Sequence, residues 1–167
     1  MLRGFTPRYE AAFAAGLARK LGLDGAPEAD AAVLGEEWLA LLAAARADFT
    51  ASFRALSAVL RGAEHPLTAG AHAERAQAWL GRWRAALAAA GAEPAATAAA
   101  LDAANPVYIP RNHLVEAALT AATAGDLGPF SELLDVVGRP FEARPGLEAW
   151  AAPGPEDARP YRTFCGT

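Results

Sequence analysis

The sequence has few of the residues that disulfides, metal sites and nucleic-acid surfaces need. Its 167 residues include one cysteine, Cys165, and one lysine, Lys20. A single cysteine cannot form an internal disulfide, and the first residues lack the apolar region of a signal peptide, so nothing predicts secretion. No apolar run reaches the roughly eighteen residues of a membrane span, and a net charge of −4 argues against nucleic-acid binding. We therefore expect a cytoplasmic protein with neither a nucleic-acid nor a membrane partner.

Alanine, the best helix former, is the commonest residue, and 53% of the chain is apolar. No segment alternates apolar and polar residues as a half-buried strand would. The fold class predicted is all-α, an irregular helical bundle of about six to seven helices with a C-terminal arm rich in proline and glycine. Proline, glycine and apolar spacing predict helices over about 7–22, 27–45, 48–62, 72–91, 94–104, 110–124 and 129–138.

Two domains follow from the change in composition after residue 138. We expect a helical domain over 1–138 and an irregular arm over 139–167, where proline and glycine are frequent. Asp48 precedes the third predicted helix and is expected to cap it. The expected core consists of large apolar residues at helical spacing: Trp38, Leu41, Phe49, Phe53, Leu56, Trp79, Trp83, Leu114 and Leu134.

The residues give little support for catalysis by this chain alone. The sequence has no glycine-rich phosphate loop, and Lys20 falls late in a predicted helix, where a cation favours the C-terminal dipole. The three histidines are not spaced with cysteine or carboxylates as metal ligands would be. We name no catalytic, cofactor-binding or metal-binding residue.

One polar segment breaks the alanine-rich pattern, and it has two interpretations. Residues 105–109 include Pro106 and are followed by Pro110, so we expect this segment to be extended. In the structural interpretation they form a rigid connector, with Asn105 capping the preceding helix and Tyr108 packed. In the functional interpretation Arg111, Asn112 and His113 form a polar site at a helix N-terminus, where backbone amides favour anions.

Several motifs together resemble the C-terminal region of the selenoprotein O (SelO/YdiU) family. They run in order as Phe5-Thr6-Pro7-Arg8-Tyr9-Glu10, Lys20-Leu21-Gly22-Leu23, Arg46-Ala47-Asp48-Phe49-Thr50, Asn105 to Leu114, Gly125-Asp126, Arg139-Pro140-Phe141 and the near-terminal Cys165. The resemblance implies a protein-kinase-like (pseudokinase) fold for the full-length protein. It also implies transfer of AMP from ATP, with Mg or Mn, to hydroxyl groups of protein substrates (AMPylation).

The kinase-like core of that family has no counterpart before Phe5. We therefore expect the chain alone to be inactive and to hold no cofactor, and to partner such a core in cis or as a split chain. The alternative is a non-enzymatic helical interaction module or a truncated gene product. Cys165 likewise has two interpretations: an inert tail thiol, or, as the resemblance implies, the tail half of a redox switch that pairs with a cysteine of the core. Gly166-Thr167 stands where the family usually has two serines.

Overall fold

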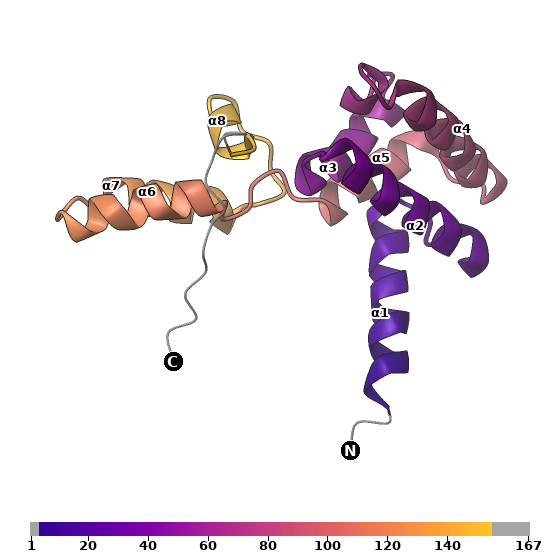
Figure 1. Cartoon of the computed structure of the whole chain (residues 1–167), viewed down its shortest axis with the longest axis horizontal. Coiled ribbons are helices and arrows are strands. Elements are labelled where there is room, and N and C mark those ends of the chain that lie inside the picture. Colours follow the sequence, from indigo (N-terminus) through magenta and orange to yellow (C-terminus); the bar gives the residue numbers. More distant parts are fainter. Residues whose placement is uncertain (1–3, 155–167) are drawn as a thin grey trace. The chain divides into compact units, whose positions relative to one another are not determined.

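The computed structural model describes residues 4–154, and none of them forms a β-strand. Over this range the chain forms seven helices of eleven or more residues, one four-residue helix and one short 3₁₀ helix, which confirms the all-α prediction (Figure 1). The chain divides into two compact units, residues 1–105 and 106–167. Each unit is described by itself.

Five α-helices build the N-terminal unit. They are α1 (Phe5–Lys20), α2 (Glu28–Ala45), α3 (Phe49–Leu60), α4 (Ala73–Ala89) and α5 (Pro94–Ala104), with the 3₁₀ helix η1 (Pro66–Thr68) between α3 and α4. Asp48 caps α3 as predicted, since its Oδ1 accepts a hydrogen bond of 2.7 Å from the amide of Ala51. The chain leaves α1 through Gly22, whose φ of +69° suits glycine. A Cβ there would lie 2.8 Å from Thr97 of α5, so glycine also permits the close approach of the two segments.

Three tryptophans form the centre of this unit. Trp38 of α2 stacks on Trp79 of α4 with ring centroids 4.3 Å apart, and Trp79 stacks on Trp83 one turn later. All three are buried. The indole N–H of Trp79 donates to the carbonyl of Leu34 at 2.9 Å, and that of Trp83 to the carbonyl of Leu21 at 2.8 Å. These bonds satisfy two buried donors and fix α4 against α2 and the end of α1.

The predicted core is confirmed at six positions and wrong at three. Buried as predicted are Trp38, Leu41, Phe53, Leu56, Trp79 and Trp83. Phe49 is 48% exposed, because it begins α3 and packs one face on Phe53 while the other faces outward. Leu134 is 60% exposed and Leu114 is only half-buried, since α6 and α7 pack mainly on each other.

The second unit contains a helix pair, α6 (Asn112–Thr123) and α7 (Gly128–Gly138), followed by α8 (Glu148–Ala151). Ala118 of α6 and Leu133 and Val136 of α7 are buried. Phe130 and Leu134 of α7 remain exposed. Helix α6 also starts later than Pro110, with Arg111 in extended geometry at its N-cap.

Residues 139–154 fold back along the start of the same unit. The carbonyl of Pro140 accepts hydrogen bonds from the amides of Val107, at 2.7 Å, and Tyr108, at 3.2 Å. Helix α8 lies within the arm that the sequence predicts as irregular, and the domain boundary at 138 stays a prediction. Within residues 4–154 no helix combines the length and apolar character that crossing a membrane requires.

Phe53 and Phe49 lie one turn apart in α3 and provide a matched pair for testing the core. We predict that Phe53→Ala lowers the free energy of unfolding by about 3–5 kcal/mol, because a fully buried ring leaves a cavity. Phe49→Ala should cost roughly 1 kcal/mol or less, because its ring is half exposed. Urea denaturation of both variants measures the two losses, and equal losses would contradict this core.

Candidate functional site

Asn105 ends the N-terminal unit and is fully buried. Its Nδ2 donates to the carbonyl of Lys20 at 2.9 Å, and its Oδ1 accepts from Lys20 Nζ at 3.2 Å. Lys20 Nζ also lies 3.5 Å from the carbonyl of Ala104. Asn105 is the C-cap residue of α5, as the structural interpretation predicts, and its backbone amide donates to the carbonyl of Leu101 at 2.9 Å. Its side chain also satisfies the carbonyl of Lys20 at the end of α1, while the Lys20 ammonium group satisfies the carbonyl of Ala104 at the end of α5.

Arg54 of α3 holds the end of α5 from a second direction. Its Nη1 donates to the carbonyls of Asp102, at 2.8 Å, and Asn105, at 2.9 Å. Its Nη2 lies 3.1 Å from the carboxylate of Asp102. The same carboxylate accepts from Ser57 Oγ and from Arg61 Nη2, each at 2.6 Å. One acidic side chain of α5 thus gathers two polar side chains of α3 and that of Arg61, which follows α3.

Charge and burial act in opposite directions on Asp102. Partial burial raises the pKa of its carboxyl group, but hydrogen bonds from Ser57 and Arg61 and the charge of Arg54 outweigh it, so the pKa lies below its ordinary value. The pKa of Lys20 is also lowered, first by burial and then by neighbouring Arg19. Because each group makes internal hydrogen bonds, both serve the packing of helix ends.

The predicted connector is held tightly at Tyr108, which is buried. Its hydroxyl accepts from the amide of Arg144 at 3.0 Å and lies 3.4 Å from the carbonyl of the same residue. The guanidinium of Arg144 lies 5.7 Å from the Tyr108 ring centroid. It also donates to the carbonyls of Asp135 and Val136 near the end of α7. These contacts support the structural interpretation of the segment.

The three residues of the predicted polar site have different surroundings. Arg111 is buried, and its Nη2 donates to the carbonyl of Ala151 in α8 at 3.0 Å. Asn112 is exposed at the first turn of α6. His113 is half-buried, with its Nδ1 3.0 Å from where a Cβ on Gly154 would lie. The guanidinium therefore binds a backbone carbonyl, and an anion site at this helix start stays a prediction.

His65 is buried, and both nitrogens of its ring lie within hydrogen-bond distance of backbone groups. Its Nδ1 accepts from the amide of Leu67 at 3.1 Å, so the proton belongs on Nε2, which lies 3.0 Å from the carbonyl of Ser52. Burial lowers the pKa of this imidazole, which favours the neutral form. In the part of the chain that the structure describes, no three histidine, cysteine or acidic side chains gather as metal ligands.

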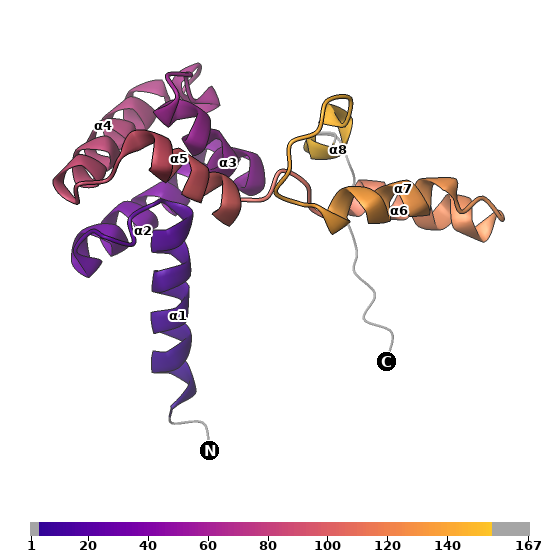
Figure 2. The same ribbon diagram turned by 180° about the vertical axis from the view of Figure 1, so that it is seen from behind.

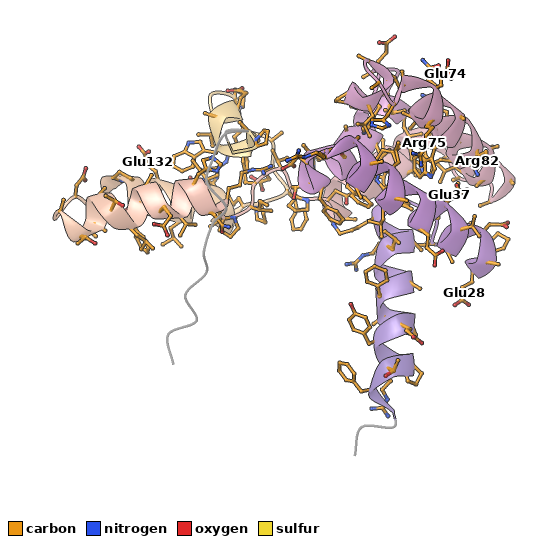
Figure 3. All side chains as sticks on the ribbon, viewed as in Figure 1. Glu28, Glu37, Glu74, Arg75, Arg82 and Glu132 are labelled. Carbon is orange, nitrogen blue, oxygen red and sulfur yellow. The ribbon has the colours of Figure 1, made fainter. Side chains whose placement is uncertain are left out.

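The surface hollows of the N-terminal unit carry few reactive groups. One of about 320 Å³ between α1 and α2 is lined mainly by alanines, with Asp24 and Glu28 as its charged residues. In another, of about 260 Å³, the guanidinium of Arg82 pairs with both carboxylate oxygens of Glu37, at 2.9 and 2.7 Å. Figure 3 shows this pair between α2 and α4, near Arg75. Glu37 is thus paired with Arg82 across the two helices.

Cys165, the predicted redox residue, lies outside the described residues. Sequence reasoning predicted the helix cap at Asn105 but missed the hydrogen bonds that its buried side chain makes. Its departure from the alanine-rich background marked it as unusual, but its partner Lys20 is 85 residues away. No local pattern connects the two side chains.

The chain matches a known family and longer proteins along nearly its whole length. The family described as protein adenylyltransferase SelO matches residues 1–138. A protein nucleotidyltransferase YdiU of Mycobacterium sp. (strain KMS) is 49% identical over 99% of this chain, which is 33% of that protein. Proteins of the same name from Rhodococcus jostii and Sphingopyxis alaskensis are 45% and 47% identical, over 100% and 96% of this chain. The chain spans about a third of the length of these curated relatives.

Two asparagines, Asn105 at the start of the connector and Asn112 in the first turn of α6, supply a test of the helix-end contacts. We predict that Asn105→Ala lowers the free energy of unfolding by about 1–3 kcal/mol, because the carbonyl and ammonium of Lys20 lose a buried partner. Asn112→Ala removes an exposed amide and should change stability by less than about 0.5 kcal/mol. Chemical denaturation compares the two, and a loss no larger for Asn105→Ala than for Asn112→Ala would refute the assigned role.

Proposed function

Because the chain belongs to the protein adenylyltransferase SelO family, we propose that it is the C-terminal helical region of a protein nucleotidyltransferase that moves AMP from ATP to protein hydroxyl groups. The observation that carries this proposal is the extent of the similarity. Identity of 45–49% runs over nearly the whole chain in proteins named nucleotidyltransferases. A region this similar over its full length is expected to keep the same structural role.

In this proposal the chain supports the reaction and does not perform it. ATP and Mg or Mn are bound by the other two thirds of the full-length protein, the kinase-like core. The described residues fit neither group well: they contain no metal-ligand cluster, and the single lysine already binds Asn105 and Ala104. Arg54, Arg111 and Arg144 likewise donate to backbone carbonyls. The polar side chains therefore hold helices and connector in place.

The partners proposed are the kinase-like core, in cis or as a separate chain, and the proteins that receive AMP. We propose that the reaction takes place in the cytoplasm. Cys165 would then be this chain's half of a disulfide with a cysteine of the core, as the family resemblance implies.

A chimaera tests the proposal directly. The chain would replace the matching third of the Mycobacterium sp. (strain KMS) relative, and labelled ATP would report AMP transfer. We predict transfer within about tenfold of the intact relative, a difference of roughly 1.4 kcal/mol in the barrier. The relative without this third should lose activity, because its core loses the supporting helices.

Two controls make the result decisive. The 167-residue chain alone should incorporate no AMP, and micromolar binding of ATP to it would contradict a nucleotide site in the core. A Phe53→Ala chimaera should lose activity together with its fold. A chimaera with native helix content that transfers no AMP, beside an active relative, would overturn the proposed function.

A further inference from the structure

Three aromatic side chains follow one side of the first half of α1 and are open to solvent. Phe5, Tyr9 and Phe13 are four residues apart, so they share one line along the helix. Successive ring centroids are 6.1 Å apart, and the residues are 65%, 58% and 51% exposed. Figures 1 and 2 both show this half of α1 clear of the other helices of its unit. We call these three residues the aromatic stripe.

The apolar surface continues from the stripe towards α3. Gly16 comes next, and a Cβ placed on it would meet nothing within 4 Å. Lys20 follows two turns after Phe13, and its ammonium lies 5.9 Å from the ring centroid of Phe49. Phe49 is itself 48% exposed. The aromatic stripe and Phe49 therefore belong to one side of the N-terminal unit, and open apolar surface of this kind marks an interaction site.

Basic side chains run along one edge of this surface. Arg8 and Arg19 are eleven residues apart, which is three helical turns, so they lie on one line beside the aromatic stripe. Within residues 4–154 neither guanidinium forms an ion pair. A complementary partner would therefore be apolar along its middle and acidic along one edge.

We propose that this surface docks onto the nucleotidyltransferase core, the two thirds of the full-length family protein that the chain does not match. This inference rests on the proposed function. The length of the relatives indicates which domain covers the surface. The curated relatives are about three times as long as the match, so most of each relative is available to cover the stripe. The core is expected to present an apolar groove with acidic side chains facing Arg8 and Arg19.

Two glycines allow a matched test of the docking surface. Gly16 in α1 and Gly81 in α4 are both inside helices, and a Cβ on either meets nothing within 4 Å. In the chain alone, Gly16→Arg and Gly81→Arg should both leave the unfolding temperature unchanged or raise it, because arginine forms helix better than glycine. A fall for Gly16→Arg in the chain alone would mean that the substitution damages the unit itself.

In the chimaera with the Mycobacterium core, the two variants should differ. Gly16→Arg places a charged side chain in the docked face and should lower the unfolding temperature by roughly 2–4 °C or more, while Gly81→Arg should not. A triple variant, Phe5→Ala with Tyr9→Ala and Phe13→Ala, should reproduce the fall without adding a charge. Its native-like unfolding in the chain alone would show that the unit itself is intact.

The outcomes separate docking from function. Equal unfolding temperatures for the two arginine variants, in a chimaera that transfers AMP, would overturn docking alone. A chimaera without transfer, in which Gly16→Arg still lowers the unfolding temperature, would overturn the proposed function and support docking. Sedimentation would detect a second copy as the occupant. A dimer of the chain that Gly16→Arg dissociates and Gly81→Arg does not would also overturn docking onto the core.

Discussion

The hydrogen bonds that Asn105 exchanges with Lys20 close the N-terminal unit. They join the last turn of α1 to the residue that follows α5, across 85 positions of sequence. Arg54 binds the carbonyls of Asp102 and Asn105 from α3, so three helices meet at one small polar cluster. Helix ends carry unsatisfied carbonyls, and burying them without donors is costly. The closure of the unit thus depends on one amide and two cations.

Polar side chains in both units bind backbone carbonyls at or near helix ends. The indoles of Trp79 and Trp83, together with Lys20 and Arg54, each donate to a backbone carbonyl. In the second unit Arg111 and Arg144 do the same. Several large apolar side chains remain exposed, among them the three rings of the aromatic stripe on α1. Exposed aromatic rings that line one side of a helix are suited to packing on another domain.

Local signals predicted the helices and the caps at Asp48 and Asn105, but they misplaced several apolar side chains. Proline, glycine and Asp48 mark helix boundaries because their backbone preferences act within a few residues. Phe49 and Leu134 match the same apolar pattern as Phe53, and only the packing of neighbouring helices decides which rings and branches are covered. The side chain of Asn105 forms hydrogen bonds with Lys20 in a distant helix, and no local pattern indicates that pairing. The partner of Arg111 could not be predicted from neighbouring residues either, because its guanidinium binds the carbonyl of Ala151 in α8.

The central claim is that α1 offers its rings to a domain outside this chain. Hydroxyl-radical footprinting measures it directly, since the rate of ring oxidation follows exposure to solvent. Phe5, Tyr9 and Phe13 should oxidise quickly in the chain alone and several-fold more slowly in the chimaera, whereas buried Tyr108 should be slow in both. Equal oxidation of the three rings in chain and chimaera would contradict the account.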